Sequence, residues 1–128
     1  MTNVELVKQA YGYFETGNID GVMSVFDPAI EWNECKGMPF VQDDGRYFGG
    51  EAIVKNVFMH LPEYFDGFQI VVSDVFGEGE KVAMEGFYQG TNKATGNPFK
   101  ANVVHIWTIS NGKLLRFFQA ADTAVLSR

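Results

Sequence analysis

The chain has 128 residues, 46% of them hydrophobic and 15% aromatic, which suits one ordinary folded domain spanning residues 1–128. Sixteen acidic residues against ten basic ones give a formal net charge of −6, and no basic stripe offers itself to a nucleic acid. No apolar run approaches the roughly 20 residues that span a bilayer, no signal peptide opens the chain, and the lone Cys35 cannot form an internal disulfide, so we expect a soluble, cytoplasmic protein.

The N-terminal residues predict two helices. Apolar residues recur at steps of three and four from Val4 to Phe14, Thr2 or Asn3 can cap the first turn, and Gly17 follows the last. The same spacing predicts a second, shorter helix over residues 19–26. We expect it to stop at residues 27–28, because proline disfavours a helical residue before it.

Residues 29–34 alternate like a strand and place Ile30, Trp32 and Glu34 on one face. We expect this face to point inward, because a tryptophan buries a large area. In the opposite arrangement Asn33 points inward and Glu34 is solvated. Residues 35–49 are predicted to be loop, and residues 50–64 a third helix that Pro62 ends or bends.

From Phe68 onward the pattern predicts antiparallel strands to the end of the chain, with turns at residues 77–80, 94–99 and 111–112 and a last strand over residues 113–125. A long meander twists strongly, so its concave face can wrap around helices. The predicted fold is α+β and cone-shaped, with the N-terminal helices packed on the concave face of a strongly curved antiparallel sheet. Such a cone encloses a cavity suited to a small apolar molecule.

The type I′ turn at residues 111–112 fixes a register for the last hairpin. Counting outward from it, His105 lies opposite Phe118 and Asp122 opposite Ala101. His105 and Asp122 then share one face, roughly 13 Å apart at about 3.3 Å per residue. Gln119 turns to the other face unless a bulge intervenes.

Four stretches carry a family resemblance: the helix pair broken by TGNID, the strand AIEWNE, the segment GGEAIVKNVF, and the end HIWTISNGKLLRFFQAADTA. Over residues 4–125 the chain resembles the nuclear transport factor two superfamily, in its SnoaL-like and ketosteroid-isomerase-like branch. The resemblance implies an α+β cone that dimerises through its sheet. Members of this superfamily isomerise steroids, cyclise polyketides, open epoxides or dehydrate substrates, and others only bind ligands or peptides, so the fold alone does not settle the function.

The candidate catalytic residues are His105, Asp122 and Glu34. A histidine suits proton transfer near neutral pH, and a buried carboxyl has a raised pKa. The resemblance to polyketide cyclases implies Asp122 as the general base and His105 as its partner. The candidate residues for substrate binding are aromatic: Trp32, Tyr47 over the opening, Phe58, Phe118 and Tyr11.

A ketosteroid isomerase uses an Asp base and two oxyanion donors, and this sequence does not have the corresponding residue at every one of these positions. The base falls at Asn33, or at Glu34 if the strand slips by one residue. The tyrosine falls at Ala10, next to Tyr11, and the protonated aspartate falls at His105. These departures argue against steroid isomerisation itself.

We therefore expect a cofactor-free acid–base enzyme of the isomerase, cyclase or hydratase type, acting on an apolar carbonyl or epoxide compound. The alternative is a non-catalytic module for ligand binding or dimerisation. Neither hypothesis includes a metal, since His60, His105, Cys35 and the carboxylates show no ligand spacing. Alternating apolar residues on the outer sheet face predict a homodimer through the sheet.

Overall fold

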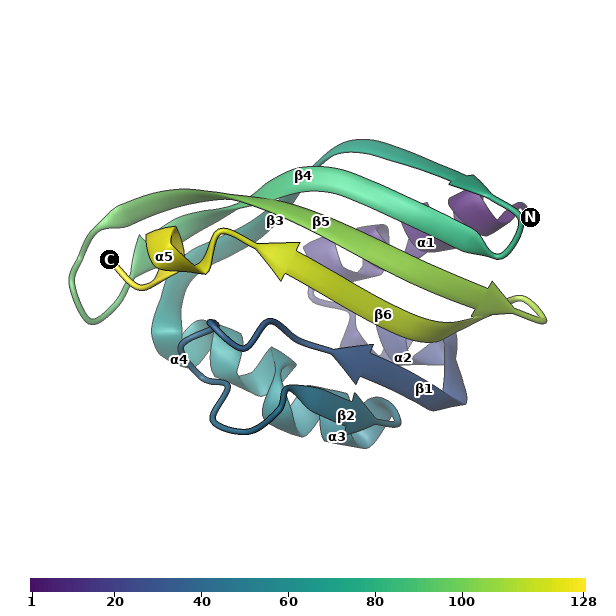
Figure 1. Cartoon of the computed structure of the whole chain (residues 1–128), viewed down its shortest axis with the longest axis horizontal. Coiled ribbons are helices and arrows are strands. Elements are labelled where there is room, and N and C mark those ends of the chain that lie inside the picture. The colour runs from purple at the N-terminus through teal and green to yellow at the C-terminus, as the bar shows by residue number, and fades with distance from the viewer.

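The chain folds into a curved sheet with helices α1 to α4 gathered against one face, in a computed structural model that describes residues 1–128 (Figure 1). The six strands are ordered β2-β1-β6-β5-β4-β3. In chain order the elements are α1 (Asn3–Glu15), α2 (Ile19–Ser24), β1 (Phe26–Asn33), β2 (Arg46–Phe48), α3 (Gly50–Asn56), the 3₁₀ turn η1 (Phe58–His60), α4 (Leu61–Tyr64), β3 (Phe65–Glu78), β4 (Lys81–Asn92), β5 (Pro98–Ser110), β6 (Lys113–Ala121) and α5 (Thr123–Leu126).

The first helix forms as predicted, and the second is shorter than predicted. The Thr2 hydroxyl accepts the Glu5 N–H at 3.1 Å, which caps α1. Helix α2 ends at Ser24, because Phe26 already begins β1. Pro28 therefore lies inside a strand instead of stopping a helix. It is tolerated there because the pairing of β1 with β6 is interrupted between Phe26 and Glu31.

The predicted loop and third helix are both more divided than the sequence pattern suggests. The loop contains the short strand β2, which pairs antiparallel with β1. The expected helix over residues 50–64 is three pieces, α3, η1 and α4, broken at Val57. Pro62 lies in the first turn of α4, where its missing N–H costs nothing, so it neither ends nor bends the helix.

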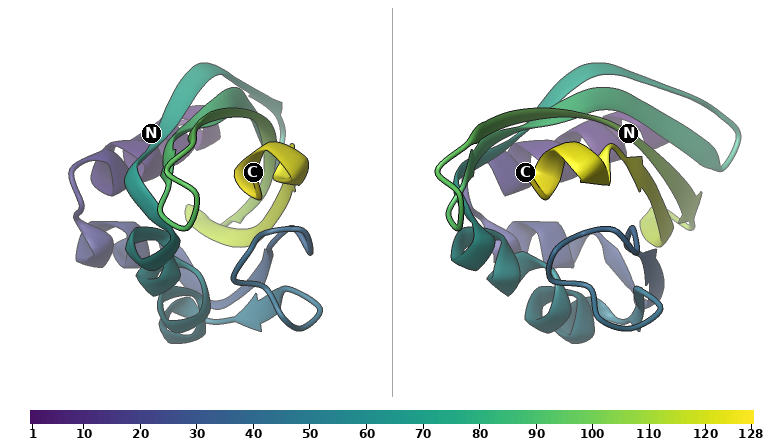
Figure 2. Two further views of the ribbon diagram at one scale, coloured as in Figure 1. Left: turned by 90° about the vertical axis from the view of Figure 1, so that its left-hand side faces the viewer. Right: turned by 60° about the vertical axis from the view of Figure 1, so that its left-hand side comes forward.

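The sheet is the curved arch that the sequence predicts, with one parallel pair added. Strands β3, β4, β5 and β6 pair antiparallel, whereas β1 pairs parallel with β6 and makes the sheet mixed. Figure 2 shows the long strands bending over the helices without closing into a barrel. Register shifts along β3 accompany the bend, and at Gly86 a Cβ would collide with the Val71 carbonyl of the neighbouring strand.

The predicted turn at residues 111–112 is present, but the register does not continue regularly beyond it. Asn111 and Gly112 both have positive φ, at 51° and 71°, and Ser110 pairs with Lys113 as expected. Leu115 is then unpaired, because Ile109 faces Leu114 and Thr108 faces Arg116. This bulge shifts the rest of β6 by one residue, so His105 lies opposite Gln119 and not opposite Phe118.

The last strand ends earlier than predicted. Strand β6 stops at Ala121, and the chain then turns into the short helix α5. The buried Asn92 side chain anchors α5 by donating to the Leu126 carbonyl at 3.0 Å.

Candidate active site

A small cavity lies between the concave face of the sheet and the helices. Its volume is about 50 Å³, and 15 of the 18 side chains around it are hydrophobic. The wall consists of Ala10, Tyr11, Phe14, Val22, Phe26, Trp32, Glu34, Met38, Val57, Phe58, Leu61, Phe68, Ile70, Tyr88, His105, Trp107, Phe117 and Gln119. Only a few of these can exchange a proton, and they are hydrogen-bonded to one another.

His105 is held at both ring nitrogens by tyrosine hydroxyls. Its Nδ1 lies 2.7 Å from the Tyr11 hydroxyl, which also accepts the Trp107 indole N–H at 2.9 Å. Its Nε2 lies 2.6 Å from the Tyr88 hydroxyl and 3.2 Å from Gln119 Oε1. Because α1, β4, β5 and β6 each contribute one of these groups, the imidazole is fixed from several sides.

Glu34 lies at the other end of the same polar chain. The Trp32 indole donates to its Oε1 at 2.9 Å, and the Gln119 amide N–H₂ donates to its Oε2. The backbone holds this residue in place, since the Glu34 N–H donates to the Gly45 carbonyl at 2.8 Å. Gly45 has a φ of 74°, and a Cβ there would strike the Glu34 carbonyl, so glycine is required for this close approach.

Gln119 joins the two ends of this polar chain. Its Oε1 accepts from the Tyr88 hydroxyl while its Nε2 donates to Glu34. We call the sequence of groups Trp107–Tyr11–His105–Tyr88–Gln119–Glu34–Trp32 the polar chain. Every buried side-chain nitrogen and oxygen in the protein has a hydrogen-bond partner.

Burial shifts the pKa values of Glu34 and His105 in opposite senses. Removal from water raises the pKa of Glu34 to about 7, against smaller lowering by the Trp32 and Gln119 N–H donors. Removal from water lowers the pKa of His105 to about 3, with Gln119 opposing the change. Burial also raises the pKa values of Tyr11 and Tyr88. At neutral pH His105 is therefore uncharged and Glu34 is poised between its two forms.

The donors determine which nitrogen of His105 carries the proton. Gln119 donates to an ionised Glu34, so its oxygen faces Tyr88 and accepts a hydrogen bond from the Tyr88 hydroxyl. The Tyr88 oxygen is then free to accept from His105 Nε2–H, and Nδ1 accepts from Tyr11. With Glu34 ionised, every hydrogen bond from Trp107 to Glu34 runs in one direction, and His105 is the Nε2–H tautomer.

The structure places five of the predicted residues on the cavity wall. Trp32 and Glu34 point inward with Ile30, as expected, while Asn33 turns outward to the Glu31 carboxylate. The other predicted residues on this wall are Tyr11, Phe58 and His105.

Three of the predicted site residues lie elsewhere. The Leu115 bulge reverses the facing of β6, so Phe118 is exposed and Asp122 lies beside a groove on the outer face of the sheet. The expectation that Asp122 shares the cavity with His105 is wrong for this reason. Tyr47 is buried against the core and donates to Asp43 Oδ1 at 2.9 Å, so it does not stand over the opening.

Sequence reasoning missed Gln119, Tyr88 and Trp107. Trp107 could have been found, because it lies two residues after His105 on the same strand and so shares its face. Tyr88 lies two residues after Gly86 and four after Met84, so it shares the inward face of β4 with them. Gln119 depends on the bulge, which the sequence offers only as an alternative.

A wider groove between α1 and β3 adjoins the cavity. It has a volume of about 530 Å³ and shares Tyr11, Phe14, Phe68 and Ile70 with the cavity wall. Phe14 contacts Phe58 edge to face, with ring centroids 5.6 Å apart. Phe14 therefore lines both spaces, whereas Phe58 lines the cavity alone.

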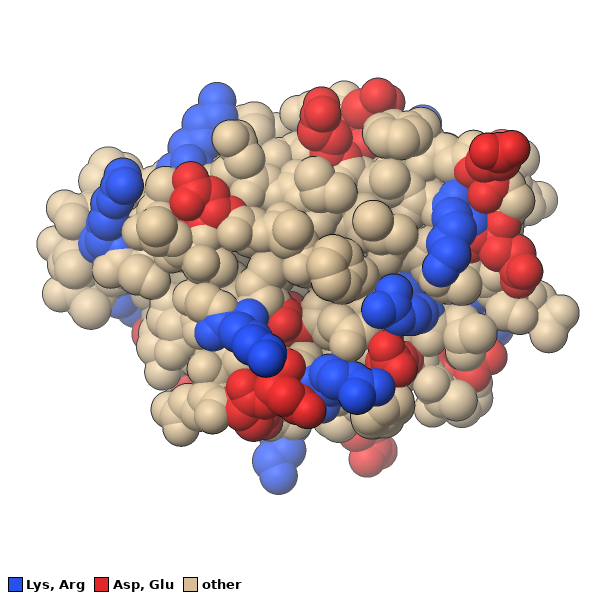
Figure 3. Space-filling model, in the orientation of Figure 1, with Lys and Arg blue, Asp and Glu red and all other residues tan.

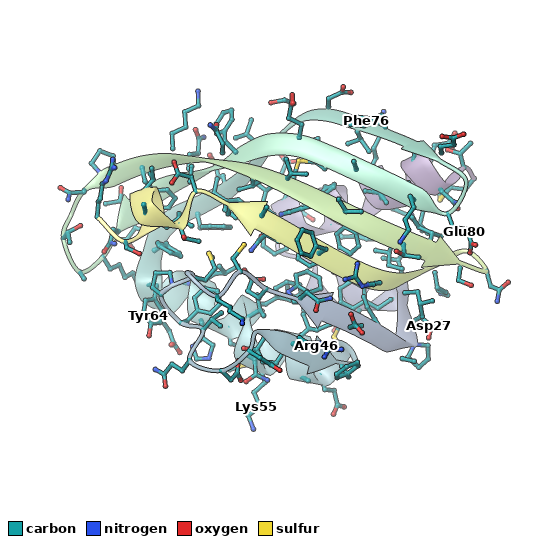
Figure 4. All side chains as sticks on the ribbon, in the orientation of Figure 1. Asp27, Arg46, Lys55, Tyr64, Phe76 and Glu80 are labelled. Atoms are coloured by element: carbon teal, nitrogen blue, oxygen red, sulfur yellow. The ribbon has the colours of Figure 1, made fainter.

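The outer face of the sheet is poor in charge. In Figure 3 the surface over β4, β5 and β6 is mostly free of Lys, Arg, Asp and Glu, and the charged side chains stand around its edges. Val104, Ile106, Phe118 and Phe76 are 36–55% exposed. Figure 4 shows Phe76 standing at the outer edge of the sheet, away from the helices.

No three His, Cys, Asp or Glu side chains lie close enough together to bind a metal ion. None of the helices is both long enough and apolar enough to cross a membrane.

Comparison with known proteins identifies a matching family and several solved structures with similar folds. The SnoaL-like domain family matches residues 7–117. An NTF2-like protein from Burkholderia thailandensis E264 is 32% identical, with a TM-score of 0.92 over 99% of this chain and 95% of that one. An NTF2-like protein of unknown function from Burkholderia pseudomallei K96243 is 22% identical, with a TM-score of 0.88 over 100% of both chains.

A further similar structure is that of TerC co-crystallised with polyporic acid. It is 25% identical, with a TM-score of 0.85 over 98% of both chains. No curated protein matches the chain.

Proposed function

The chain belongs to the SnoaL-like domain family, whose members bind small molecules, and from this premise we propose that it is a cofactor-free acid–base enzyme for a small apolar carbonyl compound. The observation that carries the proposal is Glu34, a carboxyl group buried in a mostly apolar wall with no cation beside it. Burying a carboxyl group that only neutral donors contact destabilises the fold when the group is ionised. Such a group is useful as a proton carrier, because its pKa is shifted toward neutral pH.

Glu34 is the proposed general base. With a pKa of about 7 it is partly ionised at neutral pH and is a stronger base than a solvated glutamate. Its carboxylate takes a proton from the carbon next to the carbonyl group, and the C–H electron pair moves onto the carbonyl oxygen as an enolate. Return of the proton to another carbon gives isomerisation. Ring closure follows instead if the enolate carbon attacks a second carbonyl carbon of the same molecule, whose oxygen then takes the proton from Glu34.

Tyr11 is the proposed donor to the enolate oxygen, with His105 and Trp107 holding it in position. His105 is uncharged near neutral pH, since its pKa is about 3, so it does not act as an imidazolium acid. The Tyr11 hydroxyl receives one hydrogen bond from Trp107 and contacts His105 Nδ1. A buried hydroxyl so oriented stabilises developing negative charge without the reorganisation that water requires.

The ligand is proposed to enter through the groove between α1 and β3. A cavity of about 150 Å³ holds a benzene-sized ring, whereas this cavity has about 50 Å³. A ring therefore enters only when a side chain shared by the groove and the cavity, such as Phe14, turns aside. The likeness to TerC, which was co-crystallised with polyporic acid, supports a small organic ligand.

Deuterium exchange into a simple ketone tests the proposal and does not require the natural substrate. We expect the protein in D₂O to speed the loss of the α-hydrogen signals of 2-tetralone, a fused-ring ketone, with a rate that rises with pH and levels off above about 7. Glu34→Gln should lower that rate by roughly 10²- to 10⁴-fold. Glu31→Gln is the matched control, because Glu31 lies three residues before Glu34, faces outward and pairs with Arg46 and Arg116. Equal rates in Glu34→Gln and in the unmodified protein would refute the assignment of the base.

One observation favours the alternative of a non-catalytic binding protein. Every polar atom on the cavity wall already has a partner within the protein, so none is left waiting for a substrate. Binding of polyporic acid without any effect of Glu34→Gln on affinity, together with no exchange of 2-tetralone, would support this alternative.

We also propose that the protein is a homodimer joined through the outer face of the sheet. The area over β4 to β6, which carries few charges, and the exposed Val104, Ile106 and Phe118 support this arrangement.

A further inference from the structure

Gln119 occupies an unusual place in the polar chain, because it is the only link between the carboxyl group and the histidine. It is 4% exposed, and its amide presents the nitrogen to Glu34 and the oxygen to Tyr88 and His105. A side-chain amide has a donor at one end and an acceptor at the other. Its orientation therefore fixes the direction of every hydrogen bond on either side of it.

Protonation of Glu34 conflicts with the present orientation of that amide. Both carboxylate oxygens now accept N–H groups, one from Trp32 and one from Gln119. The Trp32 indole can only donate, so a proton added to Glu34 finds no acceptor unless the Gln119 amide turns its oxygen toward it. Because both side chains are buried, an O–H that faces an N–H and has no acceptor is unfavourable, and this drives the turn.

A turned amide forces the rest of the polar chain to reverse. Gln119 Nε2 then donates to the Tyr88 oxygen, and the Tyr88 O–H must find an acceptor. The acceptor within reach is His105 Nε2, at 2.6 Å, which accepts only if the imidazole proton has moved to Nδ1. Nδ1–H then donates to the Tyr11 oxygen at 2.7 Å, and the Tyr11 O–H is released toward the cavity.

We propose that Gln119 is a positioning residue that couples the protonation of Glu34 to the tautomer of His105. His105 is the Nε2–H form when Glu34 is ionised and the Nδ1–H form when Glu34 holds a proton. The imidazole keeps one proton in both states, and the protons that it gives up at Nε2 and gains at Nδ1 are exchanged with solvent. The only proton added overall is the one on Glu34.

The coupling between Glu34 and His105 would also serve the reaction, and this step rests on the proposed function. Glu34 holds a proton just after it has taken one from the substrate. In that state the Tyr11 O–H is free to donate to the enolate oxygen, where negative charge has just developed. The base and the oxyanion donor would thus act in step.

Of the groups around the polar chain, Glu34 is the one that titrates near neutral pH. Near Glu34 are the Cys35 thiol, Tyr88 and Tyr47, and their pKa values are all raised by burial. Near His105 are Tyr11, Tyr88 and Trp107. No Lys, Arg or Asp lines the cavity, and of the two nearby aspartates Asp43 accepts from the Tyr47 hydroxyl while Asp44 accepts from the Arg46 backbone N–H.

Nitrogen-15 NMR of histidine-labelled, ligand-free protein tests the coupling directly. The chain has two histidines, and His60→Gln assigns the signals of His105. In the unmodified protein we expect the Nε2–H tautomer at pH 8.5 and the Nδ1–H tautomer at pH 5.5, where His105 is still uncharged because its pKa is about 3. Glu34→Gln should show the Nδ1–H form at both pH values, because its amide can donate to Gln119 as the protonated acid does.

Two variants separate positioning from general disturbance of the sheet. Gln119→Met should abolish the change of tautomer with pH, whereas Gln89→Met should leave it intact. Gln89 makes a comparable amide contact on β4, to Gln69 at the surface. One tautomer at both pH values in the unmodified protein, or a surviving change in Gln119→Met, would overturn the proposal. If Gln119→Met does not fold, a pH-dependent tautomer in Glu34→Gln would overturn it equally.

The two proposals fail separately. A change of tautomer with pH, together with no exchange of 2-tetralone, would refute the enzyme and leave the coupling intact. Exchange that depends on Glu34, together with a fixed tautomer, would do the reverse.

Discussion

The pKa values of Glu34 and His105 shift in opposite directions for the same physical reason. Each loses water on folding, and burial disfavours the charged form, which is the ionised form of a carboxyl and the protonated form of an imidazole. Burial in the apolar wall therefore favours the uncharged form of both side chains. Glu31, three residues before Glu34 and facing outward, shows the contrast, because hydrogen bonds from Asn33, Arg116 and Arg46 lower its pKa at the surface.

The first prediction concerns the stability of Glu34→Gln against pH. The pKa of Glu34 is raised from 4.5 to about 7 on folding, so the folded state binds more protons between these values. Stability from this group is present at low pH and is lost as pH rises through about 7. Relative to Glu34→Gln, the unmodified protein should thus lose about 3 kcal/mol of unfolding free energy between pH 4.5 and pH above 7.

Urea unfolding at several pH values measures that difference. Glu31→Gln provides the matched control and should not reproduce it, because the pKa of Glu31 is lowered and its contribution is lost as pH falls. Parallel pH curves for Glu34→Gln and the unmodified protein would show that Glu34 is solvated.

His105 changes the stability of the fold with pH in the opposite sense to Glu34. Its pKa is lowered from 6.5 to about 3, so the unfolded chain binds a proton that the folded protein rejects. Its contribution is present above about 6.5 and is lost as pH falls toward 3. The two groups offset each other between pH 4.5 and 6.5. Removing Glu34 alone should therefore expose the acid sensitivity of the site.

At the scale of elements, one unpaired residue in β6 decides which side chains form the site. The turn at residues 111–112 has the register that its sequence predicts, and a regular ladder would place Phe118 and Asp122 on the inward face. The bulge at Leu115 moves Gln119 inward instead. Bulges depend on how the strand fits its second neighbour, here β1, and that pairing is not visible in local sequence.

The second prediction follows from that bulge. Asp122→Asn should change the rate of 2-tetralone exchange by less than about twofold, because Asp122 lies on the outer face with an exposed side chain. Gln119→Met should lower the rate by more than tenfold, because it cuts the polar chain between Glu34 and Tyr88. Loss of activity in Asp122→Asn with a normal rate in Gln119→Met would contradict the placement of the site.

The third prediction concerns the aromatic rings at the mouth of the cavity. Phe14 packs against Phe58 and lines both the cavity and the outer groove. Phe14→Ala should speed the association of polyporic acid in stopped-flow fluorescence, because the ligand no longer waits for this ring to turn. Slower or unchanged association would place the entrance elsewhere.

At the scale of the whole molecule, the pattern of helices and strands predicted the architecture better than the site. Periodicity and turn residues located the N-terminal helices, the long antiparallel strands and the inward facing of Trp32 and Glu34. They missed β2, the breaks between α3 and α4, and the parallel pairing of β1, because these depend on contacts between distant segments. The polar chain draws on α1, β1, β4, β5 and β6, so only the folded chain assembles it.

The fourth prediction tests the proposed homodimer. Light scattering should give twice the 14.3 kDa of one chain. Ile106→Glu should give the mass of one chain, because a carboxylate in the middle of an apolar interface loses its water without a partner. Lys55→Glu on α3 changes charge away from that face and should leave the dimer intact. A monomer in the unmodified protein would contradict the proposal.

The proposed mechanism depends on an ionisable carboxyl group that lies in a dry, apolar cavity at the end of a hydrogen-bonded chain. A carbon-13 NMR titration of the Glu34 carboxyl, assigned by its absence in Glu34→Gln, measures this ionisation without any ligand. We predict a midpoint near pH 7, because burial outweighs the two N–H donors. A midpoint near 4.5, the value of an ordinary glutamate, would mean that water reaches Glu34 and would contradict the mechanism.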